Sequence, residues 1–228
     1  MATSCRILAQ KGLVSGILGH VSARVSSGEM VIRCRGPKER GLRHSEADDI
    51  WRFTLDGSSV DAPAGYAPPN ELPIHTQLMR RRPDVGAVVH AHPRSALLCG
   101  LAGLEPRAVF GAYNIPAARL AIEGIPVFSR SILISRADLA DEMIDAMGDR
   151  PICVLLGHGI TVAAASVEQA TVLALNLDEL LSVTVDLARL GAHPESLSER
   201  DMAELPDLGS GFNDTMAWRA LVADLDTT

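Results

Sequence analysis

Three histidines and one glutamate in this chain have the spacing and surroundings of a metal site. His90-Ala91-His92 ends an apolar segment, and side chains two residues apart on a strand point to the same face. His90 and His92 can therefore bind one ion. His158, flanked by glycines between two apolar segments, would supply a third imidazole, and Glu71 a carboxylate. Imidazole suits divalent zinc, iron, manganese or cobalt, and three histidines leave a position open for water or substrate, which indicates catalysis.

Each of these residues also has an ordinary structural interpretation. A His-x-His pair alone is equally compatible with core or surface histidines, and the glycine-flanked His158 shifts the balance toward a site. Glu71 stands where a helix begins, a place that favours a carboxylate whether or not it does chemistry. His75 lies four residues later on the same helical face, and we interpret it as a packing residue rather than a ligand.

Composition indicates one folded domain over residues 1–228. The chain is 47% hydrophobic and 21% charged, which excludes disorder, and its net charge of -7 gives no attraction to nucleic acid. The cysteines at 5, 34, 99 and 153 show no paired spacing, so we expect reduced thiols and a cytoplasmic location. No apolar segment is long enough for a signal peptide or a membrane span.

The order of periodic segments predicts an α/β fold. Apolar periodicity indicates helices at 5–18, 71–82, 94–101, 136–147, 166–190 and about 214–225, and strands at 21–25, 30–34, 50–55, 85–91, 152–156 and 160–164. Some strands are joined by tight turns and others by helices, so we expect a mixed, largely antiparallel sheet rather than a doubly wound one.

The order and spacing of four motifs resemble the class II aldolase and adducin family. The motifs are Gly19-His20-Val21-Ser22, Asn70-Glu71, His90-Ala91-His92-Pro93 and Gly157-His158-Gly159. The resemblance implies a three-layer α/β/α sandwich and a homotetramer with active sites between subunits. It also implies that His90, His92 and His158 bind one divalent transition metal ion and that Glu71 is the acid/base. Tyr113 would assist proton transfer in a neighbouring subunit's site.

Departures from the sugar-phosphate members of that family change the expected substrate. His20 and Pro69-Asn70 stand where those members have phosphate-binding asparagine and serine residues, which leaves His20 and Asn70 as substrate-binding candidates of another kind. Guanidinium groups bind carboxylates in bidentate fashion, and Arg33 and Arg35 begin a basic stretch. A solvated basic loop is the alternative for any one of its residues. Together they predict a small organic acid as substrate.

The sequence hypothesis is a metal-dependent carbon–carbon lyase that decarboxylates an ortho-hydroxylated aromatic acid. Arg-Cys-Arg-Gly-Pro at 33–37 and Gly-His-Val-Ser at 19–22 resemble a branch of the family that includes dihydroxyphthalate decarboxylases. A retro-aldolase for a non-phosphorylated hydroxy-carbonyl or hydroxy-acid is the first alternative, and an iron-dependent oxygenase the second. A non-catalytic adducin-like interaction module is the alternative of a different class.

Overall fold

Seven strands form one sheet in the order β3-β2-β1-β4-β7-β6-β5. In this computed structural model, which describes residues 1–208 and 211–225, neighbouring strands are antiparallel except for the parallel pair β5 and β6. The remaining positions of the expected 1–228 domain lie outside the described residues. The strands are β1 His20–Arg24, β2 Glu29–Arg33, β3 Ile50–Thr54, β4 Ala87–Ala91, β5 Val127–Phe128, β6 Ile152–Leu155 and β7 Gly159–Ala164.

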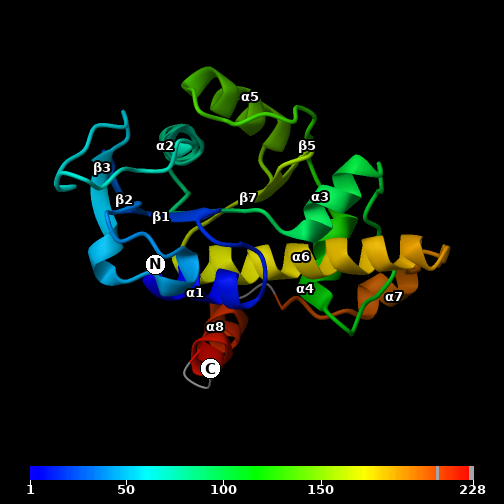
Figure 1. Cartoon of the computed structure of the whole chain (residues 1–228). Helices are drawn as coiled ribbons and strands as arrows, with labels where there is room; N and C mark the ends of the chain where they lie inside the picture. Colours follow the sequence, from blue (N-terminus) through cyan, green and yellow to red (C-terminus); the bar gives the residue numbers. More distant parts are fainter. Residues whose placement is uncertain (209–210, 226–228) are drawn as a thin grey trace.

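Helices cover both faces of the sheet (Figure 1). They are α1 Ala2–Gln10, α2 Leu72–Arg81, α3 Arg94–Leu101, α4 Ile115–Ile122, α5 Ala137–Met147, α6 Val167–Arg189, α7 Glu199–Glu204 and α8 Gly211–Leu225, with short 3-10 turns at Leu42–His44 and Ala47–Asp49. Helices α2 and α5 lie on one face, and α6 with α1, α3 and α4 lies on the other. The three-layer α/β/α sandwich and the mixed, largely antiparallel sheet are confirmed.

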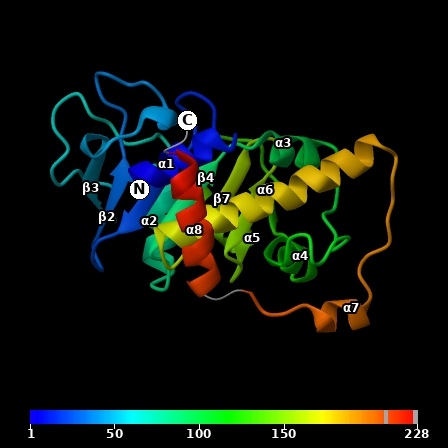
Figure 2. The same ribbon diagram turned by 90° about the horizontal axis from the view of Figure 1, so that it is seen from below.

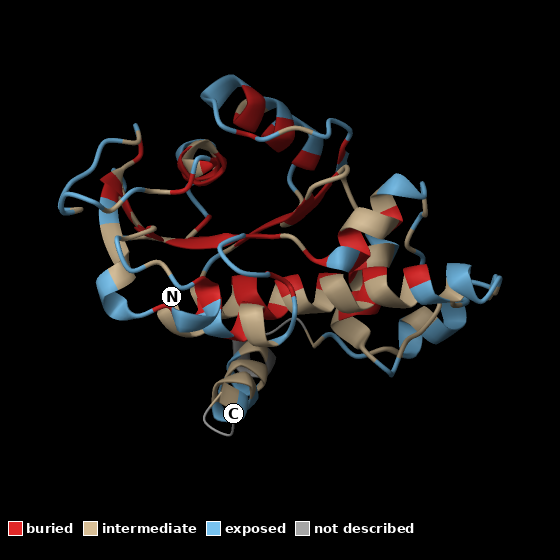
Figure 3. Ribbon diagram, viewed as in Figure 1, coloured by how far each residue is buried: buried red, intermediate tan, exposed pale blue. Residues whose placement is uncertain are grey.

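Each face of the sheet has its own apolar core. Val88 and Ala163 belong to the cluster under α2 and α5, whereas Val89 and Val162 belong to the cluster under α6. Burial is concentrated on the sheet and on the helix surfaces that face it (Figure 3). All five residues of β4 are buried because this central strand is covered on both sides, which explains its continuous apolar sequence.

The long helix α6 contacts α1, α3 and α4, the other helices on its face of the sheet. Ser166 caps its N-terminus by accepting a hydrogen bond from the Gln169 amide at 3.3 Å. Helix α8 crosses under α6 and brings the C-terminal segment beside α1 (Figure 2). No helix in the described ranges is long and apolar enough to cross a membrane.

The sequence prediction was wrong in one helix and omitted three elements. The helix expected to reach residue 18 ends at Gln10, because Gly12 and Gly16 adopt left-handed backbone angles, with φ of 81° and 58°, and turn the chain. Helices α4 and α7 and strand β5 were not predicted. Helix α7 and strand β5 have 6 and 2 residues, too few for a clear periodic signal, and α4 has an almost continuous apolar sequence with a proline in its first turn.

Candidate metal centre

His90 and His92 meet at the end of the central strand β4. His90 is the fourth residue of the strand, paired with His20 of β1 on one side and with Thr161 of β7 on the other. His92 follows the last strand residue, and its Nε2 lies 2.8 Å from that of His90. The two imidazole nitrogens therefore converge on one point, as the His-x-His spacing predicts.

His158 reaches the same point from the turn between β6 and β7. Its Nε2 lies 3.5 Å from Glu71 Oε2, and its ring centroid is 4.8 Å from that of His92. Glycines allow this approach. Gly157 has a φ of 63°, and a Cβ on Gly159 would overlap the carbonyl oxygen of Ala91. The Gly-His-Gly sequence is thus required for β7 to bring His158 against the end of β4.

Glu71 presents one carboxylate oxygen to the histidines and anchors the other. The residue is the N-cap of α2, and its Oε1 accepts a hydrogen bond of 3.0 Å from the Ile134 backbone amide. Its Oε2 lies 3.3 Å from His90 Nε2 and 3.7 Å from His20 Nε2. The Ile134 amide fixes the plane of a carboxylate that is only 4% exposed.

The donor set fits a divalent transition metal ion. One possible ligand atom from each of Glu71, His90, His92 and His158 lies within 4.8 Å of all the others. Ligand nitrogens about 2.0–2.1 Å from a tetrahedral zinc ion would be separated by about 3.3 Å, close to the 2.8 Å between the two Nε2 atoms here. Three neutral imidazoles and one carboxylate offer converging lone pairs of the kind that such an ion prefers.

Burial keeps the His90 and His92 imidazoles in the neutral state that binds a metal. Burial, helped by the neighbouring His90 and His158, lowers the pKa of His92 to about 3, and burial also lowers the pKa of His90. Burial alone would raise the pKa of Glu71, but the interactions of its carboxylate with the nearby imidazoles of His158, His20 and His90 outweigh burial and lower that pKa below its ordinary value. Neutral histidines and an ionised glutamate are the forms in which each group can be a ligand.

A second group of polar side chains, formed by His20, Ser22 and His75, lies beside this cluster. The sequence analysis did not predict that these three residues contact one another. His20 and Ser22 project from β1 toward α2, where the buried His75 contacts both of them at 2.6 Å. His75 was predicted to be a packing residue, and it is fully buried, yet both of its ring nitrogens are engaged by polar partners. The signal available in the sequence was the i, i+2 spacing of His20 and Ser22, which places them on one face of a strand.

The predicted arginines have different surroundings. Arg33 is 4% exposed, and its guanidinium donates to Glu39 at 2.7 Å. Arg35 is half-buried, donates to the Ile17 carbonyl at 3.4 Å, and contributes to lowering the pKa of His20, after burial as the main cause. Of these two arginines, Arg35 is the one without a carboxylate partner among the described residues.

Asn70 and Tyr113 lie at the surface. Asn70 is exposed immediately before Glu71. Tyr113 is 72% exposed, and its hydroxyl donates to Glu179 at 2.8 Å. The single chain does not bring Tyr113 into its own histidine cluster, and its predicted role in a neighbouring subunit stays a prediction.

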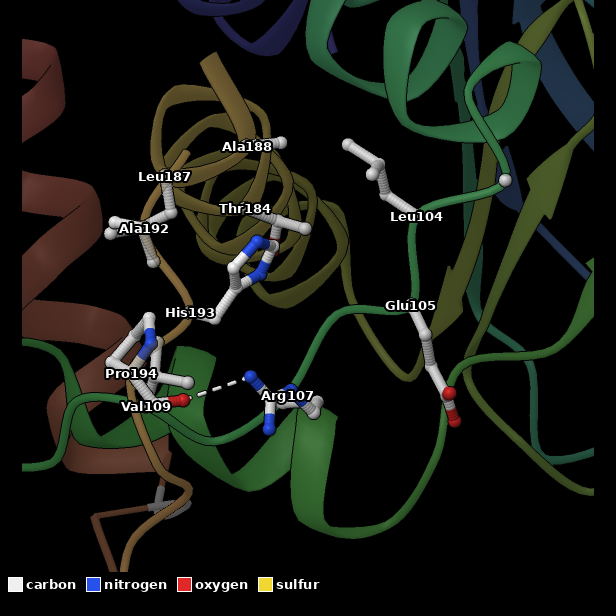
Figure 4. A pocket seen from close by; sticks show the side chains of 11 residues that line it. Leu104, Glu105, Arg107, Val109, Thr184, Leu187, Ala188, Ala192, His193 and Pro194 are labelled. Atoms are coloured by element: carbon white, nitrogen blue, oxygen red, sulfur yellow. Dashed lines mark hydrogen bonds between the residues drawn. The ribbon is translucent and has the colours of Figure 1, made fainter. Parts of the chain in front are cut away.

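A separate surface pocket is lined by α6 and the segments around residues 103–109 and 192–194. Figure 4 shows Arg107 beside His193, with the Arg107 guanidinium donating to the Pro194 carbonyl at 2.9 Å. None of the sequence-predicted site residues lines this pocket, and its arginine is occupied by a backbone carbonyl. The chemistry is concentrated at the histidine cluster instead.

Comparison with known proteins agrees with this fold. The family described as Class II Aldolase and Adducin N-terminal domain matches residues 1–185, and the chain belongs to it. It is 49% identical to a 3,4-dihydroxyphthalate decarboxylase from Arthrobacter keyseri, covering 96% of this chain and 90% of that protein. A protein of the same name from Terrabacter sp. (strain DBF63) is 45% identical, with 98% and 94% covered.

A solved structure supports the fold independently. An aldolase II superfamily protein from Pseudomonas syringae superposes with a TM-score of 0.81 at 20% identity, covering 99% of this chain and 90% of that one. At this identity the likeness concerns the fold alone.

Proposed function

We propose that this protein is a metal-dependent carboxy-lyase that removes carbon dioxide from 3,4-dihydroxyphthalate or a closely similar ortho-hydroxylated aromatic diacid. The observation that carries the proposal is the convergence of His90, His92, His158 and Glu71 on one point, in a chain that matches two 3,4-dihydroxyphthalate decarboxylases along almost its whole length. The enzyme is a lyase of the class II aldolase family.

The residues divide into ligands and groups that handle the substrate. His90, His92 and His158 would hold one divalent ion, whether zinc, manganese, iron or cobalt. When bound, such an ion supplies Lewis-acid stabilisation for the negative charge that develops as carbon dioxide leaves. Arg35 would hold a carboxylate of the substrate, and His20 and Asn70 would contact its polar groups. Arg33 supports this loop through Glu39.

Glu71 has the ionisation state and the anchoring of an acid/base group. Because its pKa lies below the ordinary value, it enters the reaction as a carboxylate and takes the proton of a phenolic hydroxyl. When the bond between ring and carboxylate breaks, the electron pair stays on the ring carbon. Glu71 then returns its proton to that carbon, and the phenol regains a proton from solvent. The bond from the Ile134 amide keeps the carboxylate oriented through both transfers.

Two wider properties are part of the proposal. The enzyme works as a homo-oligomer, a tetramer in analogy with its family, in which Tyr113 reaches a neighbouring site. It resides in the cytoplasm, where its free cysteines Cys5, Cys34, Cys99 and Cys153 stay reduced.

The test is release of carbon dioxide from a panel of ortho-hydroxylated aromatic mono- and diacids. Metal-reconstituted protein is compared with chelator-treated protein. We expect chelator-sensitive release from 3,4-dihydroxyphthalate. Absence of release from every acid, with the metal shown to be bound, would overturn the proposal, and release of an aldehyde from a hydroxy-acid would favour the aldolase alternative. Consumption of dioxygen would favour the oxygenase.

A further inference from the structure

A buried chain of hydrogen bonds links Ser22, His75 and His20 behind the metal cluster. Ser22 Oγ lies 2.6 Å from His75 Nδ1, and His75 Nε2 lies 2.6 Å from His20 Nδ1. Ser22 and His75 are wholly buried, and His20 is 3% exposed. Such short contacts between buried polar atoms require one hydrogen in each, so the chain must have a direction.

The Ser22 end indicates that direction. Among the described residues, Ser22 Oγ has His75 as its hydrogen-bond partner and no other. If the hydroxyl donates to His75 Nδ1, the hydrogens of Ser22 and His75 are both paired: His75 carries its proton on Nε2 and donates it to His20 Nδ1. In the reverse direction, Ser22 accepts from His75 and its own hydroxyl hydrogen is left buried without an acceptor, which is unfavourable.

The His20 end indicates the same direction. His20 Nε2 faces Glu71 Oε2 at 3.7 Å, beyond hydrogen-bond distance but close enough for electrostatic interaction. With Nδ1 accepting from His75, the proton of a neutral His20 is on Nε2, and the N–H dipole points toward the carboxylate. The reverse direction would aim the Nε2 lone pair at the same carboxylate. Both ends of the chain therefore favour one tautomer.

We propose that Ser22 and His75 are positioning residues that hold His20 in its Nε2–H tautomer. In this tautomer His20 donates a hydrogen bond to an anionic oxygen of the substrate and is not a fourth histidine ligand of the metal. A ligand needs an Nε2 lone pair, whereas this nitrogen carries a proton. His20 Nε2 has no hydrogen-bond partner within the described part of the chain, so its N–H is free to bind a carboxylate or phenolate oxygen. The identity of that oxygen rests on the proposed function; the tautomer does not.

The tautomer can be measured without any substrate. Nitrogen-15 NMR of zinc-reconstituted, histidine-labelled protein distinguishes protonated from unprotonated ring nitrogens, and the His20 signals are assigned by their loss in His20→Gln. We expect Nε2 to be protonated and Nδ1 to be an unprotonated acceptor. A proton on His20 Nδ1, or coordination of zinc by His20 Nε2, would overturn the proposal whatever the enzyme's substrate is.

Variants at position 75 test the consequence for the reaction. His75→Leu removes the donor to His20, whereas the side-chain amide of His75→Gln can replace the Nε2–H group. We expect His75→Leu to retain its zinc and to lose about tenfold in kcat/KM, the usual effect of one lost hydrogen bond, and His75→Gln to recover most of that loss. Equal losses in both variants, with parallel losses of thermal stability, would mean that His75 has only a packing role and would overturn the proposal.

Ser22→Ala is the smaller companion change, in case His75→Leu does not fold. It removes the group that selects the His75 tautomer, so the His20 NMR signals should shift toward a mixture of tautomers while bound zinc stays constant. Unchanged His20 signals would contradict the proposed role of Ser22. If wild-type protein shows the expected tautomer but releases no carbon dioxide from any acid, the proposed function fails and this inference stands.

Discussion

His20 and His90 lie directly opposite each other on strands β1 and β4, with ring centroids 4.8 Å apart and ring planes inclined by 22°. Their different tasks follow from what each Nδ1 contacts. His75 lies 2.6 Å from His20 Nδ1, whereas Thr161 Oγ1 lies 3.4 Å from His90 Nδ1. The hydrogen-bond partner of Nδ1 determines whether Nε2 of the same imidazole is protonated and donates, or is unprotonated and can bind a metal.

Removal of a metal ligand should abolish both metal binding and activity. In His92→Ala the converging Nε2 atom is lost. We expect at least about a 100-fold loss of metal affinity, since even the residues behind metal ligands typically contribute 10–100-fold. Metal content and carbon dioxide release are measured together. His193→Ala, which changes an exposed histidine outside the cluster, is the control and should retain both. Full activity of His92→Ala would contradict the assignment.

Glu71→Gln should separate proton transfer from metal binding. Glutamine keeps the shape of the side chain and can still accept from the Ile134 amide, but it cannot take up the phenolic proton. We expect kcat to fall by about 100-fold or more, within the range typical of general acid–base catalysis, while the three histidines retain the ion. Stopped assays with metal analysis on the same samples check this. A variant with wild-type kcat would exclude Glu71 as the acid/base.

Substitution of Gly159 should disturb the cluster through the backbone. A Cβ at this position would overlap the Ala91 carbonyl oxygen, so Gly159→Ala must push β7 away from the end of β4 and separate His158 from His92. We expect a loss of about 1–3 kcal/mol in the free energy of unfolding and weaker metal binding. Gly28→Ala, where a Cβ meets no atom within 4 Å, is the matched control. Denaturant unfolding of both variants shows whether the loss is specific.

The sequence predicted which residues cluster better than it predicted the surroundings of the cluster. His90 and His92 could be recognised because strand periodicity is local, and the helix at 94–101 begins and ends where the pattern indicates. The contact of His75 with His20 joins α2 to β1, 55 residues apart in sequence, and the bond from Ile134 to Glu71 uses a backbone amide that any residue has. Contacts between residues far apart in sequence, and hydrogen bonds from backbone amides, produce no local sequence pattern from which they could be predicted.

The metal-free protein should lose stability as the pH falls from about 6.5 to 4. Burial lowers the pKa of His20 to about 4 from a model-peptide value near 6.5, so between these values the unfolded chain binds a proton that the folded chain does not. The free energy of unfolding therefore rises with pH across this window. Urea unfolding of chelator-treated protein at several pH values measures the slope, and His20→Gln should reduce it. An unchanged slope would show that His20 titrates normally in the folded state.

Arg33 and Arg35 should respond differently to truncation, although only Cys34 separates them in sequence and both are basic. Arg33→Met removes a buried guanidinium and leaves the partly exposed Glu39 with the Gly41 amide as its remaining partner, so we expect a loss of about 1–3 kcal/mol in the free energy of unfolding, typical of one lost hydrogen bond to a charged group. Arg35→Met leaves no buried charge behind and removes positive charge beside His20. We expect near-normal stability and a raised KM for the diacid. Thermal unfolding and steady-state kinetics of both variants separate the two effects. A raised KM in a stably folded Arg33→Met protein would reverse the assignment, because it would mean that Arg33 exchanges Glu39 for the substrate carboxylate.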